Sequence, residues 1–133
     1  MDVQVGKATL DDSKALYAIH VASVGCRECR SMYTVEYLEA KLSSLNAEMY
    51  EIPILNGEVL MALKGKTIVG FGRISVETEN LCQLHWLFVH PTYFKTGVGT
   101  KLLYEMEKIA RLAKCTSISV KSSLNAFTFY KKR

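Results

Sequence analysis

The feature that most constrains the fold is an apolar segment that runs directly into a glycine-containing loop and then into an amphipathic helix. Residues 81–89 are predicted to form a buried strand, which Pro91 ends because proline lacks the amide donor of other residues. Across residues 97–113 apolar side chains recur at helical spacing, which predicts a long helix. A strand, a loop and a helix in this order are typical of a mixed α/β domain.

The rest of the sequence supplies further strands and helices. Thr9 and Asp12 have the spacing of a helix-capping box, and Thr34 is predicted to be the N-cap of a second helix. Gly70 and Gly72 lie inside a predicted strand, where glycine marks a bulge or a close approach of the backbone. The predicted order is a strand near residue 3, helices after 12 and 34, strands at 58–63, 67–76 and 81–89, a helix at 97–113, a strand at 118–120 and a last helix at 124–131.

Length and composition describe one folded domain. The chain has 133 residues, of which 49% are hydrophobic, and we expect a single domain over residues 1–133. No apolar run reaches the length of roughly 18 residues that suggests a membrane span, so no membrane partner is expected. The net charge of +4 suits a site for a polyanionic small ligand but is too small to indicate nucleic-acid binding by itself.

Four cysteines bear on the compartment and on metal binding. No signal peptide precedes them, so they are expected to be unpaired thiols in a reducing compartment, which predicts a cytoplasmic protein. Cys26 and Cys29 have the spacing of half a zinc site, but Cys82 and Cys115 stand alone and supply no second pair. We therefore expect no metal, and we interpret Cys82 and Cys115 as small buried hydrophobic residues.

The loop before the long helix is a candidate phosphate-binding site. Amides at a helix start have no intrahelical partner, and the helix dipole favours negative charge there. Gly97 and Gly99 let a phosphate approach the backbone, while Lys95 and Lys101 add positive charge. The loop is not a Walker loop or a dinucleotide fingerprint, because it lacks the Gly-Lys-Ser/Thr ending and the third glycine. The alternative is a helix start that needs small residues for packing.

Two motifs resemble the GCN5-related N-acetyltransferase (GNAT) superfamily. Residues 87–103, Leu-Phe-Val-His-Pro-Thr-Tyr-Phe-Lys-Thr-Gly-Val-Gly-Thr-Lys-Leu-Leu, are similar to its acetyl-CoA signature of strand, pyrophosphate loop and helix. Residues 123–132, Ser-Leu-Asn-Ala-Phe-Thr-Phe-Tyr-Lys-Lys, resemble its last conserved helix. The resemblance covers essentially the whole chain. It implies an α/β (α+β) domain with a mixed, mostly antiparallel sheet flanked by helices, and an N-acetyltransferase that moves the acetyl group of acetyl-CoA to an amine by direct attack.

The resemblance also assigns residues to the cofactor. The amides of Leu87 and Val89 are expected to pair with the pantetheine arm as if it were an added strand, and the backbone of the following loop to hold the pyrophosphate. Ser123 either contacts the cofactor or caps its own helix. The cofactor-binding residues expected on this basis are Leu87, Phe88, Val89, Lys95, Thr96, Gly97, Val98, Gly99, Thr100, Ser123 and Asn125.

Two residues are candidates for proton transfer. The resemblance implies that Tyr130 donates a proton to the departing CoA thiolate; alternatively it packs on the sheet. His85 is the best base on chemical grounds, because imidazole titrates near neutral pH, and its alternative role is structural. Strand alternation predicts that His85 shares a face with Gln83, opposite Leu84 and Trp86. Water and backbone carbonyls are another route for the amine proton.

The sequence departs from the family pattern at three points. Phe94 stands where the family usually has Arg or Gln, and Gln83 stands where some members have a general-base glutamate. The sequence ends at Arg133, where the family continues with Gly-Phe and one or two more strands. We therefore expect a sheet without these C-terminal strands, either by truncation or because a partner chain supplies them, which makes a homodimer possible.

The acceptor and two other functions stay open at this point. The amine could belong to a polyamine, an amino acid, an antibiotic, or a protein N-terminus or lysine, and Tyr33, Tyr37 and Tyr50 lie where the family forms its acceptor pocket. The second hypothesis is a CoA-binding domain without useful catalysis. The third is a basic adaptor for nucleic acid or protein, which only the net charge and the basic residues 131–133 favour.

Overall fold

A five-stranded sheet forms the centre of the computed structural model, which describes residues 3–25 and 34–120. The strands are β1 (Val3–Lys7), β2 (Val59–Lys64), β3 (Thr67–Val76), β4 (Leu81–Val89) and β5 (Ser117–Val120). They lie in the order β1-β2-β3-β4-β5, antiparallel from β1 to β4 and parallel between β4 and β5. The mixed, mostly antiparallel sheet that the sequence predicted is therefore confirmed.

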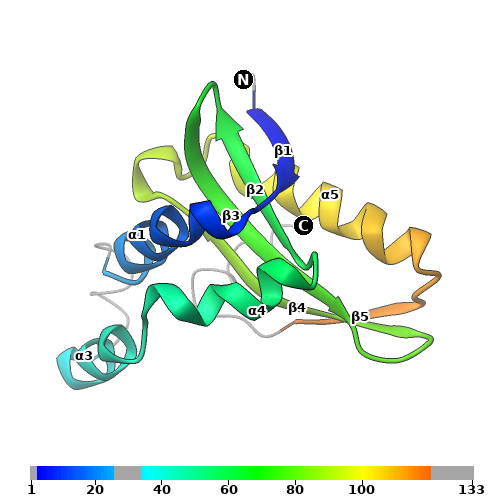
Figure 1. Cartoon of the computed structure of the whole chain (residues 1–133), viewed down its shortest axis with the longest axis horizontal. Coiled ribbons are helices and arrows are strands. Elements are labelled where there is room, and N and C mark those ends of the chain that lie inside the picture. The colour runs from blue at the N-terminus through cyan, green and yellow to red at the C-terminus, as the bar shows by residue number, and fades with distance from the viewer. Residues whose placement is uncertain (1–2, 26–33, 121–133) are drawn as a thin grey trace.

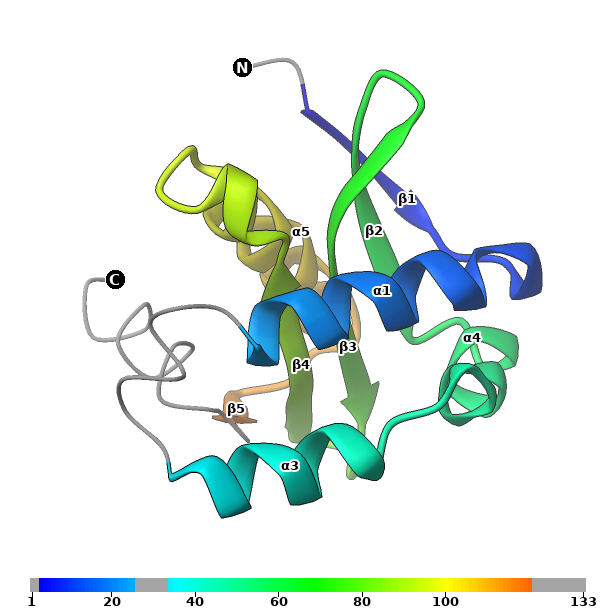
Figure 2. The same ribbon diagram turned by 90° about the vertical axis from the view of Figure 1, so that its left-hand side faces the viewer.

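Helices cover both faces of this sheet (Figure 1). On one face lies α5 (Val98–Leu112), and on the other lie α1 (Ser13–Val24) and α4 (Glu51–Leu55). Figure 2 shows α1 lying across β3 and β4. The helix α3 (Val35–Ser43) packs against α1, where Leu38 meets Val24. None of the helices in the described part of the chain has the length and apolar character needed to cross a membrane.

The helix starts follow the local signals of the sequence. The amide of Thr9 donates to Asp12 Oδ2 at 2.8 Å, so the capping box is confirmed, although it begins a short 3-10 helix (Leu10–Asp12) that leads into α1. Thr34 Oγ1 accepts from the amide of Tyr37 at 3.1 Å, as expected of an N-cap. Val35, the first residue of α3, is exposed. The helix predicted at 124–131 lies outside the described residues.

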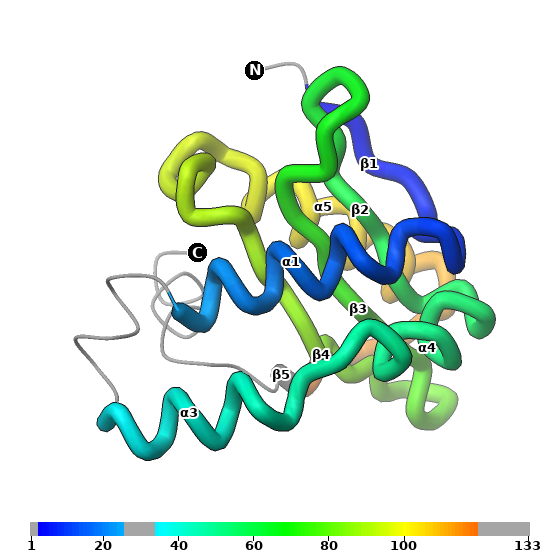
Figure 3. Tube along the Cα trace, turned by 60° about the vertical axis from the view of Figure 1, so that its left-hand side comes forward, coloured from blue at the N-terminus to red at the C-terminus, as the bar shows by residue number. Residues whose placement is uncertain are grey.

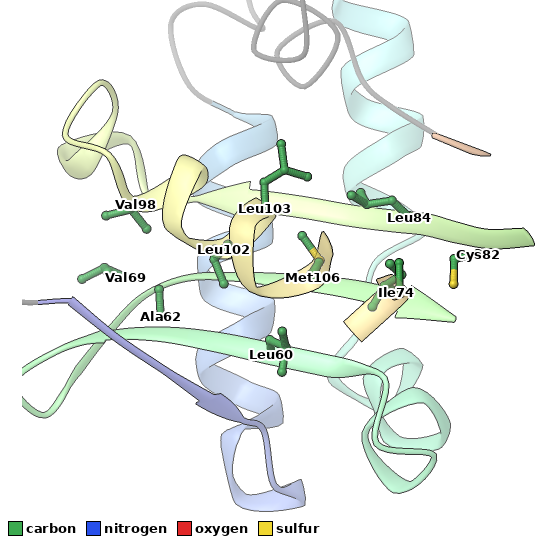
Figure 4. Packing of buried hydrophobic residues seen from close by; sticks show 11 residues of the cluster. Leu60, Ala62, Val69, Ile74, Cys82, Leu84, Val98, Leu102, Leu103 and Met106 are labelled. Carbon is green, nitrogen blue, oxygen red and sulfur yellow. The ribbon is translucent and has the colours of Figure 1, made fainter. Parts of the chain in front are cut away.

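The core beneath α5 requires glycine on the facing strand. Val98, Leu102 and Met106 of α5 point at the sheet (Figure 4), and all three are buried. A Cβ added to Gly70 would lie 3.1 Å from Val98 Cγ1, and one added to Gly72 would lie 2.9 Å from Met106 Sδ. The close backbone approach predicted from these glycines is confirmed, and it fixes the position at which α5 begins.

The two isolated cysteines are paired, contrary to the prediction from the sequence. Cys82 of β4 forms a disulfide with Cys115, which lies two residues before β5. The residues are 33 positions apart, and only the parallel pairing of β5 with the first part of β4 brings them together. The expectation that Cys82 is buried is confirmed. The disulfide removes the argument that unpaired thiols indicate a reducing compartment.

Candidate functional site

Within the described residues, the second half of β4 has no neighbouring strand on the side away from β3, and we call this side the open edge. Within the described residues β5 pairs only with the first four residues of β4, whereas β3 pairs as far as Val89. On the β3 side, the amide of His90 donates to the Val69 carbonyl at 2.9 Å, and the carbonyl of Phe88 faces the same way. Because backbone groups alternate along a strand, the amides of Leu87 and Val89 point to the open edge. These are the two amides that the resemblance assigns to the pantetheine arm.

The loop between β4 and α5 exposes a row of backbone amides. It begins as a short 3-10 helix (Pro91–Tyr93) and ends at Gly97, the N-cap of α5. Lys95 and Gly97 have positive φ angles of 61° and 94°, which curl the chain. The amides of residues 95–97 make no hydrogen bond within the described part of the chain, and those of residues 98–100 have no intrahelical acceptor. Such a row of donors at a helix start suits the oxygens of a phosphate.

Side chains hold this loop in place while its amides stay exposed. Thr96 Oγ1 donates to the carbonyl of Tyr93 within the loop. Phe94 packs against Val24 of α1 and Leu38 of α3. The position at which the family usually has a charged or amide side chain is therefore an apolar anchor here, which ties the loop to the helices on the opposite face from α5. Cofactor binding at this loop then depends on the main chain and not on that side chain.

A β-bulge lies at the other end of the open edge. Leu84 pairs with Ile74 and Trp86 with Arg73, which leaves His85 without an opposite residue on β3. Leu84 consequently lies in the core beneath α5, whereas Trp86 lies in the core beneath α1. The prediction that Leu84 and Trp86 share a face is wrong, because the extra residue shifts the alternation by one position.

His85 belongs to a polar network on the α1 face. Its Nε2 lies 2.7 Å from Ser75 Oγ and 3.5 Å from Glu77 Oε1, and Ser75 Oγ donates to Glu77 Oε1 at 3.1 Å. Because the single hydroxyl proton of Ser75 goes to Glu77, the hydroxyl of Ser75 is the acceptor in its contact with Nε2 of His85. Gln83 pairs directly opposite Ser75 and so lies beside this network, as predicted. An imidazole that is held in place by a carboxylate, as His85 is by Glu77 through Ser75, can accept a proton from an amine.

A second histidine, which the sequence analysis did not single out, lies beneath the same strand. His20 of α1 is 1% exposed, and its Nδ1 lies 2.7 Å from Tyr50 Oη. Burial, together with the charge of Lys41, lowers the pKa of His20 to about 4, so that it is neutral near pH 7. Burial, and secondarily Tyr17, raises the pKa of Tyr50. The sequence did hold a signal for His20, because this polar residue falls on the same helix face as the apolar residues Leu16 and Ile19.

The predicted site residues form one line where they are described. The later part of β4, which holds His85 and residues 87–89, continues directly into the loop that leads to α5. Figure 3 shows the chain running from the end of β4 through this loop to α5. Tyr130, Ser123 and Asn125 lie outside the described residues, as do Cys26 and Cys29. Within the residues that are described, no group of three or more His, Cys, Asp and Glu side chains could hold a metal ion.

An open strand edge that continues into a row of amides without acceptors in the described part of the chain is the arrangement expected of a domain that binds an acyl-CoA. The outward N–H groups of the strand can donate to the amide carbonyls of a pantetheine arm. The loop amides can donate to the pyrophosphate oxygens of coenzyme A. The sequence model of the Acetyltransferase (GNAT) family matches residues 26–133. The chain belongs to this family, whose members are acyltransferases.

Solved structures share the fold of this chain. A GCN5-related N-acetyltransferase from Rhodopseudomonas palustris has a TM-score of 0.85 and 28% identity, over 100% of this chain and 81% of that one. The PaiA N-acetyltransferase of Thermoplasma acidophilum in complex with coenzyme A has a TM-score of 0.84 and 22% identity, over 99% of this chain and 88% of that one. Ard1 from Thermoplasma volcanium has a TM-score of 0.70 and 17% identity, over 99% of this chain and 81% of that one. A search of curated proteins found no match.

Proposed function

We propose that the protein is an N-acetyltransferase that transfers the acetyl group of acetyl-CoA to an amine of a small molecule or peptide by direct attack. The observation that carries the proposal is the continuous line from the bulge at His85, along the outward amides of Leu87 and Val89, to the exposed amides of the loop. This line joins a candidate base to a cofactor-binding edge and a phosphate-binding loop.

Binding of acetyl-CoA falls mainly to the main chain. The amides of Leu87 and Val89 pair with the pantetheine arm, and those of residues 95–100 hold the pyrophosphate, with Lys95 and Lys101 adding charge. The bound thioester supplies an activated acetyl group. Donors that are fixed before the ligand arrives need little ordering when it binds, which favours affinity.

Proton transfer falls to His85 and Tyr130. His85 accepts the proton of the attacking amine, directly or through water, and Glu77 stabilises the imidazolium through Ser75. Tyr130 donates a proton to the CoA thiolate as the carbon–sulfur bond breaks. The acidic side chain beside the base also attracts a cationic amine to this end of the strand.

The first test is thermal unfolding with acetyl-CoA, CoA and no ligand, because a ligand that binds only the folded state raises the melting temperature. We expect a dose-dependent rise in melting temperature with both ligands, and release of a thiol when an accepted amine is added.

His85→Gln should lower kcat by about 10²- to 10⁴-fold and keep the rise in melting temperature with acetyl-CoA. Glu77→Gln should lower kcat and change the pH profile, whereas the matched variant Glu79→Gln in the same turn should behave as the native protein.

The outcomes separate the functions considered. No rise with either ligand at saturating concentration would exclude an acyl-CoA enzyme. A rise without thiol release for any amine would instead favour the CoA-binding domain without catalysis. A homodimer and a cytoplasmic location also stay proposals, which light scattering and cell fractionation would test.

A further inference from the structure

The buried pair of His20 and Tyr50 is not the arrangement that stability alone would favour. The hydroxyl of Tyr50 and Nδ1 of His20 are joined by one hydrogen bond of 2.7 Å, which leaves Nε2 as the other polar atom of the imidazole. Nε2 is buried and has no hydrogen-bond partner within residues 3–25 and 34–120. A buried polar atom without a hydrogen-bond partner costs free energy, and two apolar side chains of the same shape would avoid this cost. The pair therefore calls for another explanation.

Its contacts fall on the strand that forms the candidate site. The ring of His20 rests on that of Phe88, with centroids 4.0 Å apart and planes inclined by 30°. The ring of Tyr50 meets that of Trp86 edge-on, at 5.3 Å and 69°. Trp86 and Phe88 are the two side chains through which the site segment of β4 meets the core beneath α1. The residue between them, Leu87, presents its amide to the open edge, and His85 precedes them.

The hydrogen bond determines how the two aromatic residues are held. Aromatic rings that are not constrained prefer edge-to-face or offset packing, usually with centroids about 4.5–7 Å apart. Nδ1 of His20 must face the hydroxyl of Tyr50, and this requirement turns the face of the imidazole onto Phe88. A phenylalanine at position 20 would fill the same space, but nothing would fix its ring plane, and Phe88 would be free to tilt.

We propose that His20 and Tyr50 are positioning residues, whose hydrogen bond fixes Trp86 and Phe88 and thereby aims the amides of Leu87 and Val89 at the pantetheine arm. The inference rests on the proposed binding of acetyl-CoA at this edge. It adds His20 of α1 and Tyr50, which directly precedes α4, to the site formed at β4 and the loop after it.

The test separates positioning from a merely structural role through the double variant His20→Phe/Tyr50→Phe, which removes both polar groups and keeps both rings. We expect its melting temperature without ligand to equal or exceed that of the native protein. We expect its Kd for CoA to rise about fivefold to tenfold, the equivalent of one lost hydrogen bond. Its Kd for adenosine 3′,5′-bisphosphate, which lacks the pantetheine arm, should not change. Backbone amide resonances of Leu87 and Val89 should shift or broaden in the variant.

A double variant that binds CoA as tightly as the native protein would overturn the proposal. So would a variant whose melting temperature falls and whose affinity for both ligands falls equally, because that result describes a structural pair. Should the double variant not fold, Tyr50→Phe alone breaks the bond and leaves both rings, and the same comparison of the two ligands applies. Failure of the native protein to bind CoA at all would instead remove the proposed function.

Discussion

His20 is neutral in the folded protein because it is buried, and this makes stability depend on pH. Its pKa is lowered from 6.5 to about 4, whereas in the unfolded chain it titrates near 6.5. Above pH 6.5 both states are neutral at this residue, and it adds no pH dependence. As the pH falls from about 6.5 to about 4, only the unfolded chain takes up the proton, so the free energy of unfolding should fall by up to about 3 kcal/mol.

Denaturant unfolding of the native protein and of His20→Phe/Tyr50→Phe at several pH values between these limits would measure this contribution. The native protein should lose more stability on acidification than the double variant, since other titrating groups are common to both. Parallel curves for the two proteins would show that His20 is protonated in the folded state or is not buried.

Gly72 shows how a single missing side chain sets the packing of α5. A Cβ at this position would lie 2.9 Å from the Sδ of Met106 and 3.1 Å from the Trp86 carbonyl oxygen, and a backbone oxygen cannot easily move aside. Gly72→Ala should therefore destabilise the protein by about 1–3 kcal/mol, as overpacking does. Gly6→Ala is the control, because a Cβ at Gly6 meets nothing within 4 Å. Chemical denaturation should find Gly6→Ala near native stability, and equal losses for the two variants would contradict the packing argument.

At the scale of the element, the two edges of β4 differ in their hydrogen bonding. The amide of Val89 faces the open edge, whereas the amide of His90 donates to the Val69 carbonyl of β3. Val89→Pro removes only the outward donor, so the fold should persist while the Kd for CoA rises about tenfold. His90→Pro removes a bond within the sheet and should lower the free energy of unfolding by about 1–3 kcal/mol.

Calorimetric titration with CoA and denaturant unfolding would measure the two effects separately. A Val89→Pro variant that binds CoA like the native protein would show that the cofactor does not pair with this edge. A His90→Pro variant of native stability would show that the bond to β3 contributes little.

Element by element, the sequence patterns were informative because they are local. The periodicity of residues 97–113 predicted α5, and Thr34 predicted the start of α3, since both depend on neighbours within a few positions. Alternation along β4 failed at His85, because a bulge depends on the register between two strands. The sequence likewise shows Phe94 only as a departure from the family pattern, and the fold alone shows the two helices against which it packs.

At the scale of the whole molecule, the disulfide between Cys82 and Cys115 links β4 to the start of β5. It closes a loop of 33 residues, which in the chain-entropy model stabilises the fold by about 3–4 kcal/mol. Reduction should lower the denaturant midpoint of the native protein by a corresponding amount. The double variant Cys82→Ala/Cys115→Ala should start from the lower midpoint and should not respond to the reductant. A native protein whose denaturant midpoint does not respond to reductant would contradict this pairing. So would a thiol titration in which Cys82 and Cys115 both react before any reductant is added.

The sequence by itself determined the order of the elements, the loop with its exposed amides and the family, because each rests on spacing within a short stretch of chain. Tertiary structure alone decided which edge of β4 is open, where the alternation shifts at His85, that Cys82 meets Cys115, and that His20 bonds to Tyr50. All four depend on how strands far apart in the chain pair and on which helix lies over them. Such pairings leave no periodic trace in a single sequence, since the residues involved are ordinary in their local context.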